Sequence, residues 1–166
     1  GIVMDRYDQL QCYMIMGGIP YYLSMLNKSV SLAQNIDQLF FAKNASLKEE
    51  FNDLYRALFK NAMPHIEVVT ALAKKGKGLT RKEILSYTKL TDNGMFSTVL
   101  EELEHCGFIR QYVPLEGSGN MGGKRLNSDT LFQLVDFYTL FYFDFIKNNL
   151  YQDEHFWMVS MNSPLY

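Results

Sequence analysis

Apolar residues recur at helical spacing in the first part of the chain. Residues 5–16 place them three or four positions apart, which predicts a helix that ends at Gly17 and Gly18. Ile19-Pro20 then begins a second short helix, expected to run to about residue 26. Proline suits its start because the N–H that it lacks has no partner within the helix at that position.

Two capping boxes predict the next helices. A Ser-x-x-Gln pattern at 31–34 predicts a helix to about residue 41, and a Ser-x-x-Glu pattern at 46–49 predicts one to about residue 60. The second of these has apolar side chains along one stripe, as a helix packed on a core does. Residues 1–62 are therefore expected to form a small helical bundle.

The pattern changes after residue 62, where Met63-Pro64 interrupts the chain. Helices are expected over 65–74, over 80–87 behind a third capping box (Thr80 with Glu83), and from the Thr91-Asp92-Asn93 cap to Gly107. β-branched and aromatic runs then predict strands at 108–113 and 131–135. This order is typical of a winged helix-turn-helix domain with a two-stranded wing, over residues 63–135. The expected fold class is mainly α, a bundle followed by a winged helix.

The segment after residue 135 is aromatic on nearly every side of its expected helix, residues 136–149. A helix that is apolar all round is expected to be buried all round. We therefore expect an adjoining domain or a second copy of the chain to cover it, with residues 136–166 leading into a missing downstream domain.

Composition narrows the classes of function. The formal net charge is −2 and 48% of residues are apolar, so the chain has material for a core but no strongly basic surface. Cys12 and Cys106 are far apart, and the three histidines show no metal-ligand spacing, so no metal site is predicted. No apolar run is long enough to span a membrane. The chain reads as cytoplasmic, with no membrane partner.

A glycine-rich stretch at 117–122 reads Gly-x-Gly-x-x-Gly and is followed by Lys124 and Arg125. Phosphate-binding loops of this kind need a strand before them and a helix after them. Here a strand is expected on both sides, which favours the tip of a hairpin. A wing that touches a DNA backbone through Lys124 and Arg125, with Arg81 and Lys82 nearby on the fold, stays open as the alternative.

An ordered series of motifs carries a family resemblance. "MGGIPYYL", "SLAQNIDQLFF", "LKEEFNDLYRALF", "GLTRKEI", "LEELEHCGFI" and "LVDFYTLFYFDFI" together cover almost the whole chain. The series resembles the region after the nucleotide-binding core in prokaryotic AAA-type ATPases of the archaeal ATPase family, within the STAND class. The resemblance implies a helical lid in which Gly18 and Pro20 contact the nucleotide. It also implies ATP with magnesium in the full-length protein.

The resemblance sets the expected function. We expect a non-catalytic C-terminal regulatory segment with no catalytic residue. Its lid would close on nucleotide, and its winged helix would contact the upstream ATPase core, a downstream domain or a second copy. The full-length protein is expected to be an ATPase, and this chain alone is not expected to hold a cofactor. The alternative is a winged-helix transcriptional regulator that binds DNA. Glu101, Glu102 and Glu104 repel phosphates, which favours the regulatory segment of an ATPase over the DNA-binding regulator.

Overall fold

The computed structural model describes residues 4–112, 130–149 and 153–161. By its internal contacts the chain divides into two compact units. Unit 1 combines residues 1–54 with residues 137–166, and unit 2 is residues 55–136. The described residues are mainly helical, with a small three-stranded antiparallel sheet. The sequence-based division into 1–62, 63–135 and 136–166 stays a prediction about domains.

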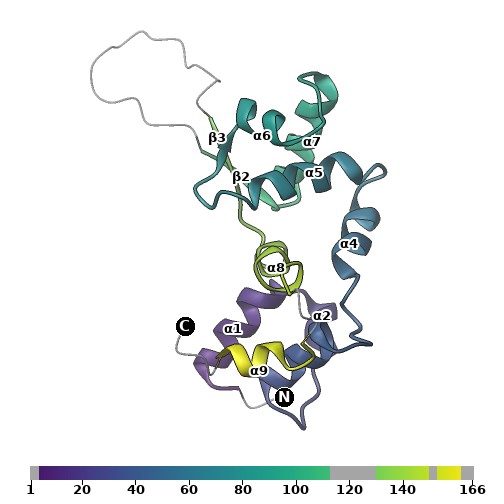
Figure 1. Ribbon diagram of the computed structural model, residues 1–166, viewed down its shortest axis with the longest axis vertical. Coiled ribbons are helices and arrows are strands. Elements are labelled where there is room, and N and C mark those ends of the chain that lie inside the picture. The colour runs from purple at the N-terminus through teal and green to yellow at the C-terminus, as the bar shows by residue number, and fades with distance from the viewer. Residues whose placement is uncertain (1–3, 113–129, 150–152, 162–166) are drawn as a thin grey trace, which may run out of the picture. The chain divides into compact units, whose positions relative to one another are not determined.

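Unit 1 is built from short helices (Figure 1). Helix α4 begins in unit 1 and ends in unit 2, and η1 and η3 are π-helical turns that continue α3 and α8. The elements are α1 (Arg6–Met16), α2 (Pro20–Ser24), α3 (Leu32–Ile36), η1 (Asp37–Phe41), α4 (Glu50–Leu58), α8 (Phe137–Phe141), η3 (Tyr142–Ile146) and α9 (Phe156–Met161).

Local signals set the ends of the first helices as predicted. The Asp5 carboxylate accepts a hydrogen bond from the Asp8 N–H at 2.8 Å and caps α1, which ends at Gly17 in the left-handed conformation (φ 61°). Ser31 and Gln34 form both hydrogen bonds of the expected capping box. These contacts join residues only a few positions apart, so the sequence alone could specify them.

The helix expected from Ser46 begins later, at Glu50, so that prediction is wrong in its start. Leu47 is fully buried, and its backbone N–H donates to the Leu39 carbonyl at 2.9 Å. Burial of this side chain beside η1 holds the backbone in a turn. Tertiary packing therefore overrides the capping pattern at 46–49.

Aromatic rings of α8 and η3 form the core of unit 1. Tyr138, Phe141 and Phe143 are buried, and the Phe51 ring stacks on Tyr142 at 4.0 Å between centroids. Helix α8 packs against α1. Other elements of unit 1 cover these three buried rings, whereas Phe137 is 37% exposed. The expectation that an adjoining domain or a second copy covers the segment stays a prediction.

The described part of unit 2 contains a helix, a strand, two helices and two strands in that order after the end of α4 (Figure 1). The sheet order is β1-β3-β2, and both pairs are antiparallel. The elements are α5 (Met63–Leu72), β1 (Leu79–Thr80), α6 (Arg81–Tyr87), α7 (Gly94–His105), β2 (Ile109–Tyr112) and β3 (Leu131–Leu134).

Most of the predicted elements of unit 2 are confirmed. The capping box of Thr80 and Glu83 opens α6, and the Asn93 side chain accepts from the Phe96 N–H at 3.1 Å to open α7. Four apolar side chains at helical spacing along α7 are buried: Phe96, Val99, Leu100 and Leu103.

Strand β1 was not predicted, because two residues give no periodic pattern. It pairs with β3 at Leu79–Phe132. Gly78 precedes it with φ 91°, and a Cβ there would lie 2.8 Å from the Phe132 carbonyl oxygen. This close approach of two backbones requires glycine.

Candidate functional site

The turn between α1 and α2 holds Gly18 and Pro20, the residues predicted to contact a nucleotide. Gly17 and Gly18 have φ of 61° and 72°, so the chain reverses between the two helices. Pro20 is the first residue of α2 and is exposed, as is Tyr21 beside it. The turn presents a rigid apolar surface to solvent, which fits contact with the flat ring of a base and also fits a plain helix break.

Arg81, the first residue of α6, is engaged by its own unit. Its Nε and Nη2 donate to the Asp92 carboxylate at 2.8 and 2.6 Å, and Nη2 also donates to the Ser97 hydroxyl at 3.1 Å. The guanidinium lies 4.6 Å from the centre of the Phe96 ring. These contacts link α6 to α7 and its preceding loop, and they use donors that a phosphate would need.

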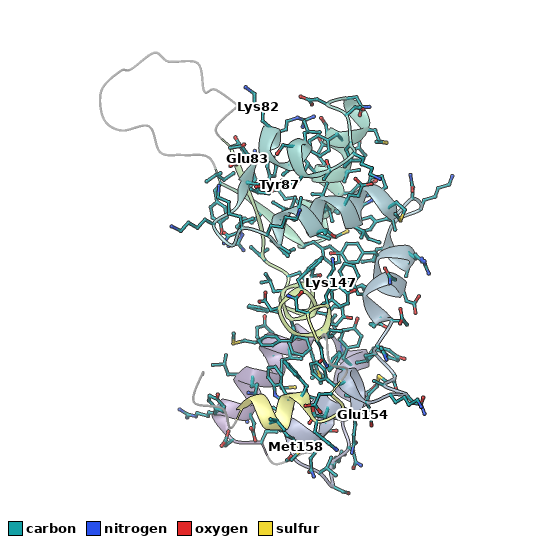
Figure 2. All side chains as sticks on the ribbon, in the orientation of Figure 1. Lys82, Glu83, Tyr87, Lys147, Glu154 and Met158 are labelled. Carbon is teal, nitrogen blue, oxygen red and sulfur yellow. The ribbon has the colours of Figure 1, made fainter. Side chains whose placement is uncertain are left out.

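Lys82 points away from α6 into solvent (Figure 2). The pKa of the neighbouring Glu83 is lowered from 4.5 to about 2. The main cause is the hydrogen bond that the Thr80 N–H donates to the Glu83 carboxylate, and the Lys75 ammonium donates a second one at 3.0 Å. Of the four basic residues predicted to touch DNA, Arg81 and Lys82 lie in the described part. Of these two, Arg81 is held by Asp92 and Ser97, whereas the exposed Lys82 side chain is the one that could reach a phosphate.

The other two, Lys124 and Arg125, lie outside the described residues, as does the glycine-rich stretch at 117–122. The elements that flank this stretch are described. β2 ends at Tyr112 and β3 begins at Leu131, and the two strands pair with each other. The prediction that strands precede and follow the loop is confirmed. The pairing of these two strands fits a hairpin connection, whereas a phosphate-binding loop needs a helix after it.

A polar cavity of about 450 Å³ lies between α7 and the sheet of unit 2. Glu101 and Glu104 contribute carboxylates to its wall, and Arg81 contributes the guanidinium that Asp92 already neutralises. The Glu104 carboxylate also accepts a hydrogen bond from the Gln111 N–H at 3.3 Å. This hydrogen bond uses a backbone donor of the edge strand β2. The cavity wall is therefore acidic in net character.

His65 is buried at the N-terminal end of α5, where it connects three parts of unit 2. Its Nε2 lies 2.6 Å from Glu102, its Nδ1 lies 3.0 Å from the Asn61 carbonyl, and its ring stacks on Phe59 at 3.9 Å. Both ring nitrogens are occupied by protein groups, so this histidine has a structural role. Within the described ranges, no group of three or more metal-ligating side chains occurs.

Sequence reasoning missed the partners of these residues. Nothing in the sequence pairs Arg81 with Asp92 across eleven positions, or His65 with Glu102 across thirty-seven. Neither pair has a local signal in the sequence that could have found it.

Comparisons with protein-family models, curated proteins and solved structures find no match to this chain. In the described part of the chain, no helix combines the length and the apolar character that crossing a membrane requires. The functional argument therefore depends on the geometry of the two units and on the motifs of the sequence.

Proposed function

We propose that the chain is a non-catalytic regulatory segment of a nucleotide-switched ATPase of the AAA/STAND type, and that unit 2 is a winged helix that contacts protein. The proposal that unit 2 contacts protein is argued from the acidic exposed face of α7. Glu101, Glu102 and Glu104 are all exposed, and α7 has no lysine or arginine.

The winged-helix assignment is supported by element order and sheet order. Helix α5, strand β1, helices α6 and α7, and strands β2 and β3 follow one another, and β3 lies between β1 and β2. In this fold α7 would occupy the place of the helix that enters the major groove of DNA.

A DNA-reading role for that helix conflicts with its charge. DNA binding gains most of its affinity from lysine and arginine near phosphates, and base-reading helices also approach the backbone closely. Three carboxylates on one helix oppose that approach. A basic or apolar protein surface is the better partner for α7, where Met95 is also half-exposed.

The lid assignment rests on the motif series and is supported by the turn at Gly18 and Pro20. The exposed proline would pack against the base of a nucleotide held by a core elsewhere in the protein. The described residues of this chain would supply an apolar wall and backbone groups, and ATP with magnesium would belong to that core. Nucleotide would then shift unit 1 between open and closed positions.

A DNA-binding assay separates the protein-contact role from the regulator alternative. Fluorescence anisotropy of a labelled mixed-sequence duplex at physiological salt should show no saturable binding tighter than about 10⁻⁴ M, the weak end of non-specific binding. The Glu101→Lys variant should bind more tightly, because it removes one of the repelling charges. Salt-dependent binding by the unaltered chain that is lost in a Lys124→Ala/Arg125→Ala double variant would instead support a DNA-binding regulator.

A nucleotide-affinity measurement tests the lid. In the full-length protein, Pro20→Ala should weaken ATP binding, whereas Leu23→Ala on the same helix should not. Alanine is a good helix former, so the substitution keeps α2 while removing the proline ring. Equal ATP affinity in both variants and the unaltered protein would rule out the lid assignment.

A further inference from the structure

Unit 1 has an apolar groove of about 390 Å³ between α1 and the α8–η3 segment, with Trp157 of α9 in its wall. On the α1 side it is lined by Tyr7, Leu10 and Met14, which follow one another at intervals of three and four residues. These side chains are 64%, 57% and 51% exposed. The outward stripe of α1 is thus apolar, although a surface helix is normally polar on that side.

The opposite wall has matching periodicity. Phe137, Leu140 and Asp144 line it at intervals of three and four residues, and Phe137 is 37% exposed. The two helical segments are in contact, and each contributes a row of side chains to one wall of the groove. The stripe from Tyr7 to Met14 extends about 10 Å along the helix axis.

The shape favours a helix over a small molecule as the occupant. Small-molecule sites enclose most of their ligand's surface, and the side chains around them are correspondingly covered. Here the rim residues Tyr7, Leu10 and Met14 are more than half exposed, so the groove is open along its length. An open trough with apolar side chains at helical spacing is the geometry that accepts the apolar face of an amphipathic helix.

The charge in the groove specifies the chemistry of that helix. Of the described residues that line it, Asp144 alone is charged, and its side chain is exposed. A lysine or arginine beside the apolar stripe of an incoming helix would reach it. A second copy of this chain is the competing occupant, and concentration-dependent self-association would reveal it.

We propose that this groove binds an amphipathic helix of a partner protein whose apolar face is flanked by basic residues. Leu10 and Met14 would contact the apolar face, and Asp144 would select for positive charge. The inference does not depend on the proposed nucleotide switch, because none of these residues belongs to the turn at Gly18 and Pro20.

Trp157 is the only tryptophan of the chain, so its emission reports on the groove. The probes are two fluorescein-labelled amphipathic peptides about five turns long, one with leucine and lysine and the other with leucine and glutamate. We expect saturable anisotropy with the lysine peptide, a change in Trp157 emission over the same range, and weaker binding of the glutamate peptide.

Three variants locate the binding. Leu10→Ala should weaken the binding of the lysine peptide about five-fold or more, as truncation of a central interface residue does. Asp144→Asn should weaken the binding of the lysine peptide about two- to five-fold, which is the effect of an exposed charge pair. The affinity for the glutamate peptide should stay the same or rise. Leu23→Ala is the matched control, because Leu23 is a partly exposed leucine of unit 1 outside the groove.

Several results would overturn the proposal. Equal affinity for the two peptides would remove the selection for charge, and binding unaffected by Leu10→Ala would place the peptide elsewhere. Concentration-dependent self-association that Leu10→Ala abolishes would assign the groove to a second copy of the chain. Binding of dodecylammonium without either peptide would assign it to a small amphiphile.

Discussion

Replacement of Phe141 by alanine tests whether the aromatic segment at 137–146 is the core of unit 1. Phe141 is 4% exposed, and its ring centroid lies 5.2 Å from that of Phe40 and 5.4 Å from that of Trp157. Phe41 and Phe145 contact it from other sides, at 6.2 and 5.5 Å. The substitution removes all four ring contacts and leaves a cavity.

The expected loss of stability is large. Truncation of a buried phenylalanine to alanine costs about 3–5 kcal/mol, because apolar burial is lost and the surroundings collapse only partly. With a loss of about 4 kcal/mol and a urea dependence of about 2 kcal/mol per molar, the unfolding midpoint should fall by about 2 M urea. Phe141→Leu keeps much of the volume and should cost about 0.5–1.5 kcal/mol.

Urea titration monitored by Trp157 emission is the assay, because this tryptophan lies in unit 1 and reports on its packing. Tyr21→Ala is the control, since Tyr21 belongs to the same unit and is 61% exposed. Its substitution should change the stability by no more than about 0.5 kcal/mol.

The reasoning is refuted if Phe141→Ala shifts the midpoint no more than Tyr21→Ala does. That result would mean that the rings around Phe141 do not pack as described. If Phe141→Ala fails to fold, Phe141→Leu decides the matter. A midpoint for Phe141→Leu equal to that of the unaltered chain would contradict close packing of the ring.

Three further predictions concern unit 2. Gly78→Ala should destabilise the chain by more than about 1 kcal/mol, seen as a lower Tm in calorimetry. Gly76→Ala is the control, because a Cβ at Gly76 meets open space. Equal effects of the two substitutions would contradict the close backbone approach at Gly78. Because the Glu83 pKa is lowered to about 2, its contribution is complete above its ordinary pKa of 4.5 and is lost as pH falls toward 2. The Tm difference between the unaltered chain and Glu83→Gln should therefore shrink over that window, and a constant difference would count against the cap. A double-mutant cycle of His65→Ala and Glu102→Gln should give a coupling of about 0.5–3 kcal/mol, and a coupling of zero would show that the contact contributes nothing to stability.

The sequence by itself determined the features that depend on neighbours a few positions apart. The caps at Asp5, Ser31, Thr80 and Asn93 hold hydrogen bonds between residues three apart. Those at Ser31, Thr80 and Asn93 lie where their patterns predict. The inward stripe of α7 follows from helical spacing. The strands on both sides of the glycine-rich stretch follow from β-branched and aromatic composition, and they favour a hairpin over the strand–loop–helix order of a phosphate-binding loop.

The candidate site was only partly within reach of the sequence. Its motifs singled out Gly18, Pro20, Arg81 and Lys82, and the acids of α7 were correctly expected on that helix. The sequence could not indicate that Asp92 and Ser97 occupy the Arg81 guanidinium. Each of these groups has a common residue type and no local pattern, so only their distance in space defines the contact.

Tertiary structure decided the long-range pairings and the burial of the aromatic segment. The buried Asp37 carboxylate accepts hydrogen bonds from the N–H groups of Trp157 and Met158, more than a hundred positions away, and so holds the start of α9. The Leu47 side chain is buried and moves the start of α4 past its capping pattern. The reason is common to both: local hydrogen bonds and spacing choose an element, whereas the burial of apolar surface chooses which elements meet.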